Sequence, residues 1–288
     1  MASLLSLKRR IQAAQNVSKT TRAMQMISAS KLKKAQNSAL SLRTYAEKLI
    51  NLSQGLTTKI DKERLHPYMA ENSIPKETLA VVLSPDKGLC GILITNVTKE
   101  FLRFAKSDSF LYITVGKKAE SKIASFGKPR VLASFPFGNT TPTFDMVYPI
   151  TRIIDEYFMG KRVGSVKILY SHFTSIFTQT PKVETLLPIK ISIEEKIEQN
   201  SAYLFEPDLN TLLSPLLKHY LEMSLYRYLL ESFISEQAAR MVAMQNATNN
   251  AKDVILELRL EYNKSRQEKI TNEILDITNK GTSLSQLD

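Results

Sequence analysis

Glycine and proline are missing from two long stretches near the ends of this 288-residue chain and gather in its middle. Residues 1–54 and residues 216–280 contain neither, and all eleven prolines lie between Pro67 and Pro215. Because glycine and proline interrupt helices, their absence over such lengths predicts two long terminal helices. A different kind of structure is expected between them.

The first helix is expected from about Leu5 to Leu56 and the second from after Pro215 to about Thr278, which makes them roughly 75 and 95 Å long. Both carry apolar and small residues at spacings of three and four, as does a face that packs on a partner helix. In the first helix this face comprises Ile11, Ala14, Val17, Ala23, Met26, Ile27, Ala29, Leu32, Ala35, Ala39 and Leu42. In the second it comprises Ala238, Met241, Val242, Gln245, Thr248, Ala251, Val254, Ile255, Leu258, Tyr262, Ile270, Ile274 and Ile277. The faces hold alanine and polar residues rather than leucine, so we predict a closely packed antiparallel coiled coil.

The middle of the chain has a shorter hydrophobic period. Four apolar runs are typical of short buried strands: Thr78–Leu83, Phe110–Val115, Arg130–Phe135 and Val166–Tyr170. Helical stretches separate them, at Ile92–Lys106, Lys117–Phe126 and Thr143–Phe158. This alternation predicts a Rossmann-like, mostly parallel α/β sheet. A fifth strand, Val183–Ile189, is expected at an edge because it holds Pro188.

The predicted fold is therefore a long coiled coil with an inserted α/β domain. Its parts are an N-terminal helix over residues 1–58, an α/β domain over residues 75–205 and a C-terminal helix over residues 208–288. Residues 59–77 and 191–210 form the connections.

The net charge of +11 is unevenly distributed. Residues 1–46 hold nine Lys and Arg and no acid, whereas residues 218–278 hold eight Lys and Arg against nine Asp and Glu. A basic helix of this kind suggests an acidic protein, a membrane surface or nucleic acid as partner, with a merely solvated face as the plainer interpretation. Tyr45 is the only aromatic residue before residue 68, which weakens the nucleic-acid alternative without removing it. An acid-free start also matches an organelle transit peptide, but the helical pattern continues past 40 residues without a break.

No catalytic constellation is recognisable. Cys90 is the one cysteine, which precludes an internal disulfide and suggests a reducing compartment. The histidines are scattered, and no cluster has metal-ligand spacing. The turn Ser84–Gly91 follows a strand, as phosphate loops do, but its glycines fit neither nucleotide-binding pattern, so a structural turn is expected. A nucleotide-dependent enzyme using the middle sheet remains a further hypothesis. No run of 18 apolar residues exists.

Two long segments resemble one known family. Leu7–Gln36 (LKRRIQAAQNVSKTTRAMQMISASKLKKAQ) is similar to the N-terminal signature of the gamma subunit of F-type ATP synthases. Ala238–Thr271, with ARMVAMQNATNNAKDVILELRLEYNKSRQEKIT, is similar to its C-terminal signature. In the middle, Asp86–Gly91 (DKGLCG), followed by Asn96, resembles the turn after the family's first strand.

This resemblance implies a rotor without a catalytic site or cofactor of its own. In the family, the two terminal helices stand inside a ring of alternating alpha and beta subunits, and the Rossmann-like domain sits beside epsilon and the c-ring. Rotation driven by proton flow takes the catalytic beta sites through different conformations. The implied partners are the alpha, beta, epsilon and delta subunits and the c-ring, with no nucleic acid. The implied location is peripheral, on the cytoplasmic side of the cell (inner) membrane.

The resemblance also implies roles for individual residues. Arg266 and Gln267, together with Thr271, match a polar catch for a beta-subunit loop. Met24 matches a position facing acidic beta-subunit loops, where an added charge is expected to disturb coupling. Further, weaker candidates for contacts with those loops are Lys31, Lys33 and Lys34.

The chain departs from the family in two places. Residues 277–288 are more polar than the usual glycine- and alanine-rich tail, so we assign no bearing residues there. The cysteine pair that gives chloroplast members thiol control is absent, because Cys90 is alone. Since the first residues coincide with the family's start, a bacterial enzyme is expected.

Overall fold

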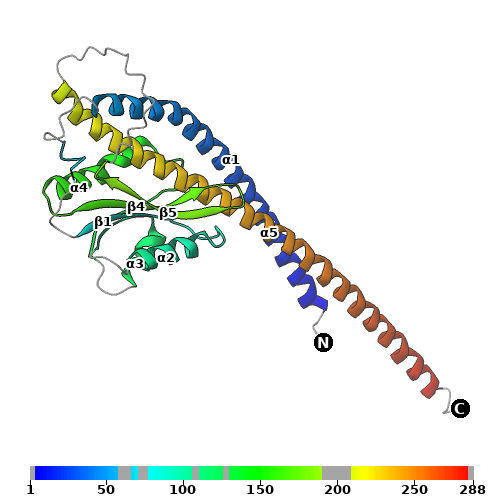
Figure 1. Cartoon of the computed structure of the whole chain (residues 1–288). Helices are drawn as coiled ribbons and strands as arrows, with labels where there is room; N and C mark the ends of the chain where they lie inside the picture. The colour runs from blue at the N-terminus through cyan, green and yellow to red at the C-terminus, as the bar shows by residue number, and fades with distance from the viewer. Residues whose placement is uncertain are drawn as a thin grey trace. The chain divides into compact units, whose positions relative to one another are not determined.

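The computed structural model describes residues 4–57, 66–70, 77–105, 110–125, 130–189 and 209–284. Two helices, α1 (Leu4–Thr57) and α5 (Leu209–Leu284), account for most of both ends (Figure 1). The chain forms two compact units. One combines residues 1–27 with 243–288, and the other is residues 28–242.

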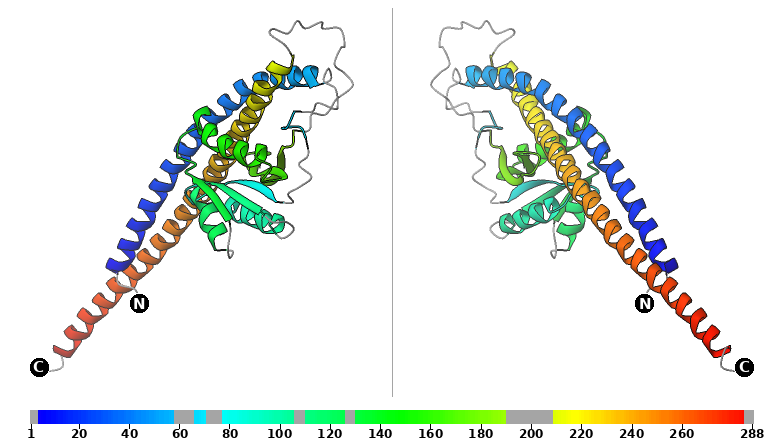
Figure 2. Two further views of the ribbon diagram at one scale, coloured as in Figure 1. Left: turned by 90° about the vertical axis from the view of Figure 1, so that its left-hand side faces the viewer. Right: turned by 90° about the vertical axis from the view of Figure 1, so that its right-hand side faces the viewer.

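The first unit is a pair of helices, drawn in blue and in orange to red in Figure 2. The less exposed side chains of α1 recur at alternating spacings of three and four: Leu4, Leu7, Ile11, Ala14, Ser18, Thr21 and Gln25. On α5 the same spacing is kept by Met244, Thr248, Ala251, Ile255, Leu258, Tyr262 and Ser265. An alternation of three and four is the heptad pattern of a coiled coil. We call these two rows the seam.

The predicted packing face of α1 is partly wrong. Val17, Met26 and Ile27 were expected in the seam but are 52%, 59% and 55% exposed, and Ala23 is exposed as well. Polar residues occupy this part of the seam, because Thr and Gln side chains of the two helices form hydrogen bonds with each other. On α5, Val254 and Ile270 (each 44% exposed) and Ile274 (60%) also lie outside the seam. The side chain of Ile277 lies outside the described residues.

The second unit contains a five-stranded sheet of order β3-β2-β1-β4-β5. The strands are β1 (Thr78–Leu83), β2 (Phe110–Val115), β3 (Arg130–Phe135), β4 (Ser165–Phe173) and β5 (Gln179–Leu187). The first four strands are parallel and β5 is antiparallel to β4. The predicted coiled coil with an inserted, mostly parallel α/β sheet is therefore confirmed.

Helices cover both faces of this sheet. On one face, α2 (Leu93–Phe104) and α3 (Lys117–Ala124) bury Val97, Phe101 and Ile123. On the other lie α4 (Val147–Met159), which follows the short helix η2 (Phe144–Met146), and the helices α1 and α5.

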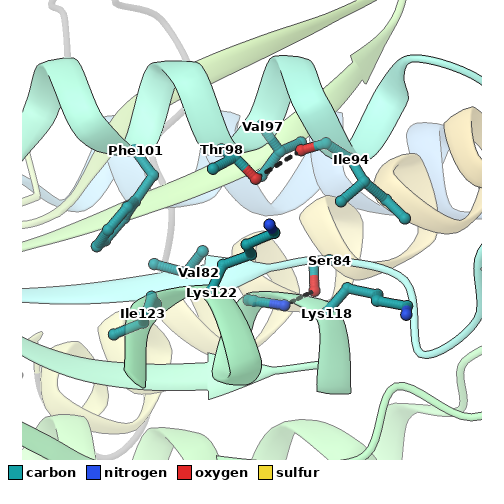
Figure 3. Close-up of a pocket in the computed structure, with 10 residues that line it drawn as sticks. Val82, Ser84, Ile94, Val97, Thr98, Phe101, Lys118, Lys122 and Ile123 are labelled. Carbon is teal, nitrogen blue, oxygen red and sulfur yellow. Dashed lines mark hydrogen bonds between the residues drawn. The ribbon is translucent and has the colours of Figure 1, made fainter. Parts of the chain in front are cut away.

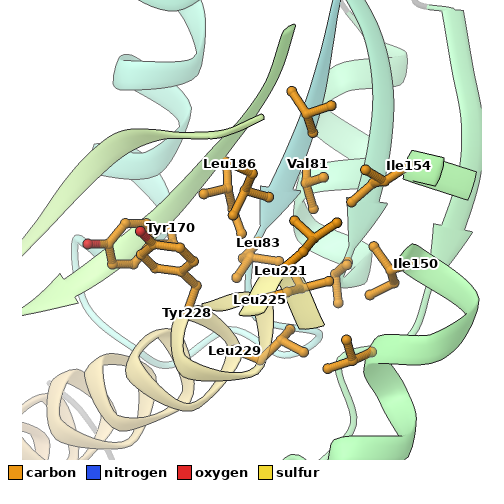
Figure 4. Packing of buried hydrophobic residues seen from close by; sticks show 14 of the residues in the cluster. Val81, Leu83, Ile150, Ile154, Tyr170, Leu186, Leu221, Leu225, Tyr228 and Leu229 are labelled. Atoms are coloured by element: carbon orange, nitrogen blue, oxygen red, sulfur yellow. The ribbon is translucent and has the colours of Figure 1, made fainter. Parts of the chain in front are cut away.

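The core on this second face is built by a leucine ladder. Leu221, Leu225 and Leu229 of α5 point toward Leu83 of β1 and Ile150 of α4 (Figure 4). Leucines four residues apart share one side of a helix, and each fully buried leucine stabilises by about 1.5–3 kcal/mol. The α/β domain is thus fastened to α5 by apolar packing over several turns.

Two details of the predicted elements need correction. Pro215 lies inside α5, although the helix was expected to begin after it. A proline inside a helix costs about 3 kcal/mol or more, and burial of the neighbouring Leu213 and Leu217 (4% and 0% exposed) offsets that cost. Strand β3 is largely exposed rather than buried, because it is an edge strand. The edge position expected for the fifth strand is confirmed, and Pro188 follows β5 directly.

One anchor within the predicted connection 59–77 was missed. Tyr68 is buried (4% exposed), its hydroxyl donates to Oδ1 of Asp155 at 2.6 Å, and its carbonyl accepts from the N–H of Ile189 at 2.7 Å. Burial and the neighbouring Asp155 raise the pKa of Tyr68, so the phenol stays protonated. Nothing in the polar sequence around Tyr68 indicated this role. The division into 1–58, 75–205 and 208–288 stays a prediction.

Candidate functional site

The three residues predicted as a polar catch lie near the described end of α5. Ser265 is the last partly buried seam residue, and all residues from Arg266 to Leu275 are exposed. Gln267 and Thr271 are four residues apart and therefore share one side of the helix, where the Thr271 hydroxyl donates to the carbonyl of Gln267 at 3.0 Å. Arg266 lies one residue away on the adjoining side.

This stretch also exposes apolar side chains. Ile270, Ile274 and Leu275 are 44%, 60% and 52% exposed. Lys269 and Glu273 form an i,i+4 ion pair at 3.6 Å, which adds only a few tenths of a kcal/mol to the helix. A helix that presents both polar and apolar groups beyond its own seam has surface available for another chain.

The predicted contact residues of α1 have different surroundings. Met24 is partly buried beside the seam residue Gln25. Lys33 and Lys34 are exposed. Lys31 is partly buried, and its Nζ donates to the carbonyl of Asn139 at 2.5 Å. The structure thus places Lys31 in a contact within its own chain, which the sequence did not indicate.

Polar pairs in the seam were only partly foreseen. The hydroxyls of Thr21 and Thr248 lie 2.8 Å apart, and Gln25 Nε2 donates to Oε1 of Gln245 one turn away. Thr248 is 2% exposed, so its hydroxyl depends on protein partners. Its Oγ1 also bonds the carbonyl of Met244 at 2.8 Å. Hydrogen bonds across a seam specify register, whereas apolar side chains can slide past one another.

The turn after β1 is held by its own chain. Oδ1 of Asp86 accepts from the N–H of Lys117 at 2.9 Å and of Phe137 at 3.3 Å, and Oδ2 accepts from the N–H of Gly138 at 2.8 Å. The Ser84 hydroxyl accepts from the N–H of Ala119 at 2.6 Å. These hydrogen bonds fix the position of the turn, as a structural turn requires.

A small pocket lies beside this turn, between α2 and α3 (Figure 3). Val82, Val97 and Phe101 contribute to its apolar lining, and Lys118 and Lys122 contribute from α3. The hydroxyl groups of Ser84 and Thr98 complete the polar part of the lining.

The cysteine and two of the histidines have surroundings that the structure describes. Cys90 is buried, and burial raises the pKa of its thiol, which makes it less reactive. His219 contacts the hydroxyl of Tyr45 at 2.8 Å and the carboxylate of Glu222 at 3.6 Å, and His172 contacts Glu231. Within the described part of the chain, no three His, Cys, Asp or Glu side chains are placed to hold a metal ion. No helix in that part is long and apolar enough to cross a membrane.

Comparisons with known proteins agree over nearly the full length. A family model described as ATP synthase matches residues 3–283. The ATP synthase gamma chain of Dehalococcoides mccartyi is 40% identical over 99% of this chain and 100% of its own. That of Roseiflexus castenholzii is 34% identical over 100% of both.

Solved structures are similar as well. A central-stalk/c-ring structure of Tetrahymena thermophila mitochondrial ATP synthase contains a chain with a TM-score of 0.60 and 25% identity, covering 79% of this chain and 99% of that one. A chain of the Euglena gracilis mitochondrial enzyme has a TM-score of 0.69 at 18% identity, covering 98% of this chain and 94% of that one, which supports the fold alone.

Proposed function

This chain belongs to the family of ATP synthase gamma chains, the non-catalytic central-stalk subunit of that enzyme, and on that premise we propose that it couples ion flow to the catalytic cycle by rotating. The observation that carries the proposal is the full-length similarity to gamma chains, which includes both long helices. The resemblance seen in the two terminal segments is confirmed by the same similarity.

The mechanism we propose follows from asymmetry. Two helices of unequal sequence present different side chains in different directions, so a surrounding ring of catalytic subunits meets a different surface at each angle. Turning the helices would then drive each catalytic site through successive conformations. ATP hydrolysis in those sites would drive the opposite rotation.

We assign the more specific grip to Arg266, Gln267 and Thr271. Their exposure on α5 supports this assignment, because a contact with another subunit requires accessible side chains. An arginine offers five N–H donors in a planar fork, which suits a carboxylate or a run of carbonyls on a partner loop. The exposed Ile270 and Ile274 in the same stretch would add apolar contact.

The basic residues of α1 are assigned weaker contacts with acidic loops of the beta subunits. Lys33 and Lys34 are exposed, and Met24 lies partly buried between them and the N-terminus. Exposed ion pairs contribute about 0–1 kcal/mol each and are screened over about 10 Å at 0.1 M salt. Weak contacts suit a shaft that releases one partner and meets the next. Lys31 would make such a contact only after its Nζ releases the carbonyl of Asn139.

The proposed partners are the alpha, beta, delta and epsilon subunits and the c-ring, in a complex at the cytoplasmic face of the cell (inner) membrane. Affinity purification of the tagged chain, followed by mass spectrometry, tests this set. We expect alpha and beta subunits in stoichiometric amounts. Purification of the chain without them would overturn the proposal, and strong binding to nucleic acid at physiological salt would favour the alternative.

The grip is tested by the double variant Arg266→Ala with Gln267→Ala in membrane-bound enzyme. We expect lower gradient-driven ATP synthesis and unchanged folding of the chain, because both side chains are exposed. Arg259→Ala is the matched control, since Arg259 is exposed and lies one heptad earlier on the same helix. Equal synthesis by the double variant and the wild type would exclude the assigned grip.

A further inference from the structure

A buried polar cluster joins the α/β domain to α5 at the carboxyl end of β1. Arg240 and Glu236 lie one turn apart on α5, and their side chains are only 11% and 6% exposed. Nη1 of Arg240 donates to Oε1 of Glu236 at 2.6 Å. A buried charge of this kind is retained only when it is paired and hydrogen-bonded.

The rest of the guanidinium reaches the turn after β1. Nη2 of Arg240 donates to the carbonyls of Lys87 and Gly88 at 3.2 Å each, and Nε donates to the carbonyl of Gly88 at 3.4 Å. Glu236 therefore fixes one end of a planar donor fork, and the fork grips two consecutive backbone carbonyls. Lysine carries the same charge but cannot reproduce this planar geometry.

The gripped turn is itself tied to two other loops. Asp86, directly before Lys87, accepts from the N–H groups of Lys117, Phe137 and Gly138. Asn139, the next residue, accepts from Lys31 of α1. The carboxyl ends of β1 and β3 and the start of α3 are thus linked to α5 through Arg240 and to α1 through Lys31.

Directional bonds at this edge complement the leucine ladder described above. Apolar packing is non-directional, so it resists separation of the domain from α5 more than sliding or turning along it. Hydrogen bonds from Arg240 to the carbonyls of Lys87 and Gly88 fix the position of the turn along α5. We propose that Arg240, oriented by Glu236, is the positioning residue that locks the register of the α/β domain on α5, with Lys31 and Asn139 as the second tie on α1.

This lock has a consequence for coupling, which rests on the proposed function. If the α/β domain takes up rotation, the helices must turn with it without slippage. A residue that fixes the domain on α5 then contributes to coupling through the position of the domain.

Hydrogen–deuterium exchange of the assembled complex tests the lock through Arg240→Lys. We expect residues 84–91 and 137–139 to exchange about tenfold faster, the factor for losing one charge-assisted hydrogen bond, while residues 78–83 and 166–170 keep their protection. Arg152→Lys is the control, because Arg152 is exposed on α4 and should leave both regions unchanged. Unchanged exchange over 84–91 in the Arg240 variant would overturn the proposal.

Two further measurements cover other outcomes. If Arg240→Lys does not assemble, Glu236→Gln replaces it, since glutamine retains an acceptor for Arg240 but not the charge, and faster exchange over 84–91 is again expected. Loss of gradient-driven ATP synthesis with ATP hydrolysis retained supports the role in coupling, and unchanged synthesis beside faster exchange overturns that role. If the wild-type chain does not assemble with catalytic subunits, the proposed function is refuted instead. Hydrogen–deuterium exchange of the isolated full-length chain would then still decide whether Arg240 fixes the domain on α5.

Discussion

The hydroxyl pair between Thr21 and Thr248 gives a quantitative test of the seam. Each hydroxyl also has a carbonyl on its own helix: Thr21 Oγ1 lies 3.0 Å from the carbonyl of Val17, and Thr248 Oγ1 lies 2.8 Å from that of Met244. A hydroxyl has one hydrogen, so one residue donates across the seam and the other donates to its own helix. Replacing either threonine by valine leaves one of the two bonds, because the remaining hydroxyl still has the carbonyl of its own helix as acceptor.

The expected energies follow from this arrangement. Thr21→Val or Thr248→Val alone should destabilise the helix pair by about 0.5–1.5 kcal/mol, because the remaining hydroxyl keeps a carbonyl partner and is not orphaned. The double variant should be close to wild type, since both polar groups are replaced by apolar groups of the same shape. Because the coupling energy is the double-variant loss minus both single losses, the double-mutant cycle should give a coupling energy of about 1–3 kcal/mol in magnitude.

Urea unfolding of the full chain, read by exchange protection in residues 14–27 and 244–258, measures these values. Thr271→Val is the control, since Thr271 is exposed and its hydroxyl donates to the carbonyl of Gln267 on the same helix. It should change stability by less than about 0.5 kcal/mol and show no coupling to Thr21. Additive losses in the Thr21 and Thr248 double variant would refute the reasoning about this pair.

Three other perturbations have expected outcomes. Gly116→Ala should destabilise by about 3 kcal/mol or more, because φ is +106° and the new Cβ would lie 1.9 Å from the Ser84 carbonyl oxygen. Gly88→Ala is the control, since a Cβ there meets nothing within 4 Å, and equal melting temperatures for the two variants would contradict the prediction. Burial raises the pKa of Glu236 above 4.5 despite Arg240, so the folded chain holds more protons than the unfolded chain, and stability falls as pH rises from 4.5 through the folded pKa. Glu236→Gln should therefore gain stability relative to wild type on going from acid to neutral pH in urea titrations, and a constant difference would contradict the shift. Met24→Lys should lower coupled synthesis, and normal synthesis would remove Met24 from the contact surface.

The sequence was sufficient for the architecture because glycine, proline and hydrophobic period report local structure. The bounds of three strands, including Thr78–Leu83, agree with the prediction to the residue. Pro215 misled, because a single proline near a helix start is outweighed by buried neighbours such as Leu213 and Leu217. The exposure of β3 also escaped prediction, since strand order is a long-range property that short apolar runs do not carry.

Surface assignments were harder for a related reason. On α1 the apolar residues Val17, Met26 and Ile27 lie outside the seam, and Thr21 and Gln25 lie inside it, because complementary polar groups on α5 satisfy them. Such pairing depends on residues more than 200 positions apart. The fork of Arg240 on the turn carbonyls was likewise invisible, since the backbone carbonyls it binds have no signature in sequence.

The resemblance to gamma subunits placed the catch at Arg266, Gln267 and Thr271, and these residues remain a prediction. The structure adds that they are exposed and that the seam stops just before them. No pattern of residues within a single chain identifies the loop they would meet. That information lies in the partner.

Rotation itself is the most direct test of the central claim. A probe attached through Lys99→Cys, an exposed position on α2, would report the orientation of the chain in a complex whose catalytic ring is fixed to a surface; Cys90 is buried and should not be labelled. On addition of ATP, the account predicts continuous rotation of the probe in one direction. ATP hydrolysis that proceeds at the normal rate while the probe stays at a fixed angle would contradict it.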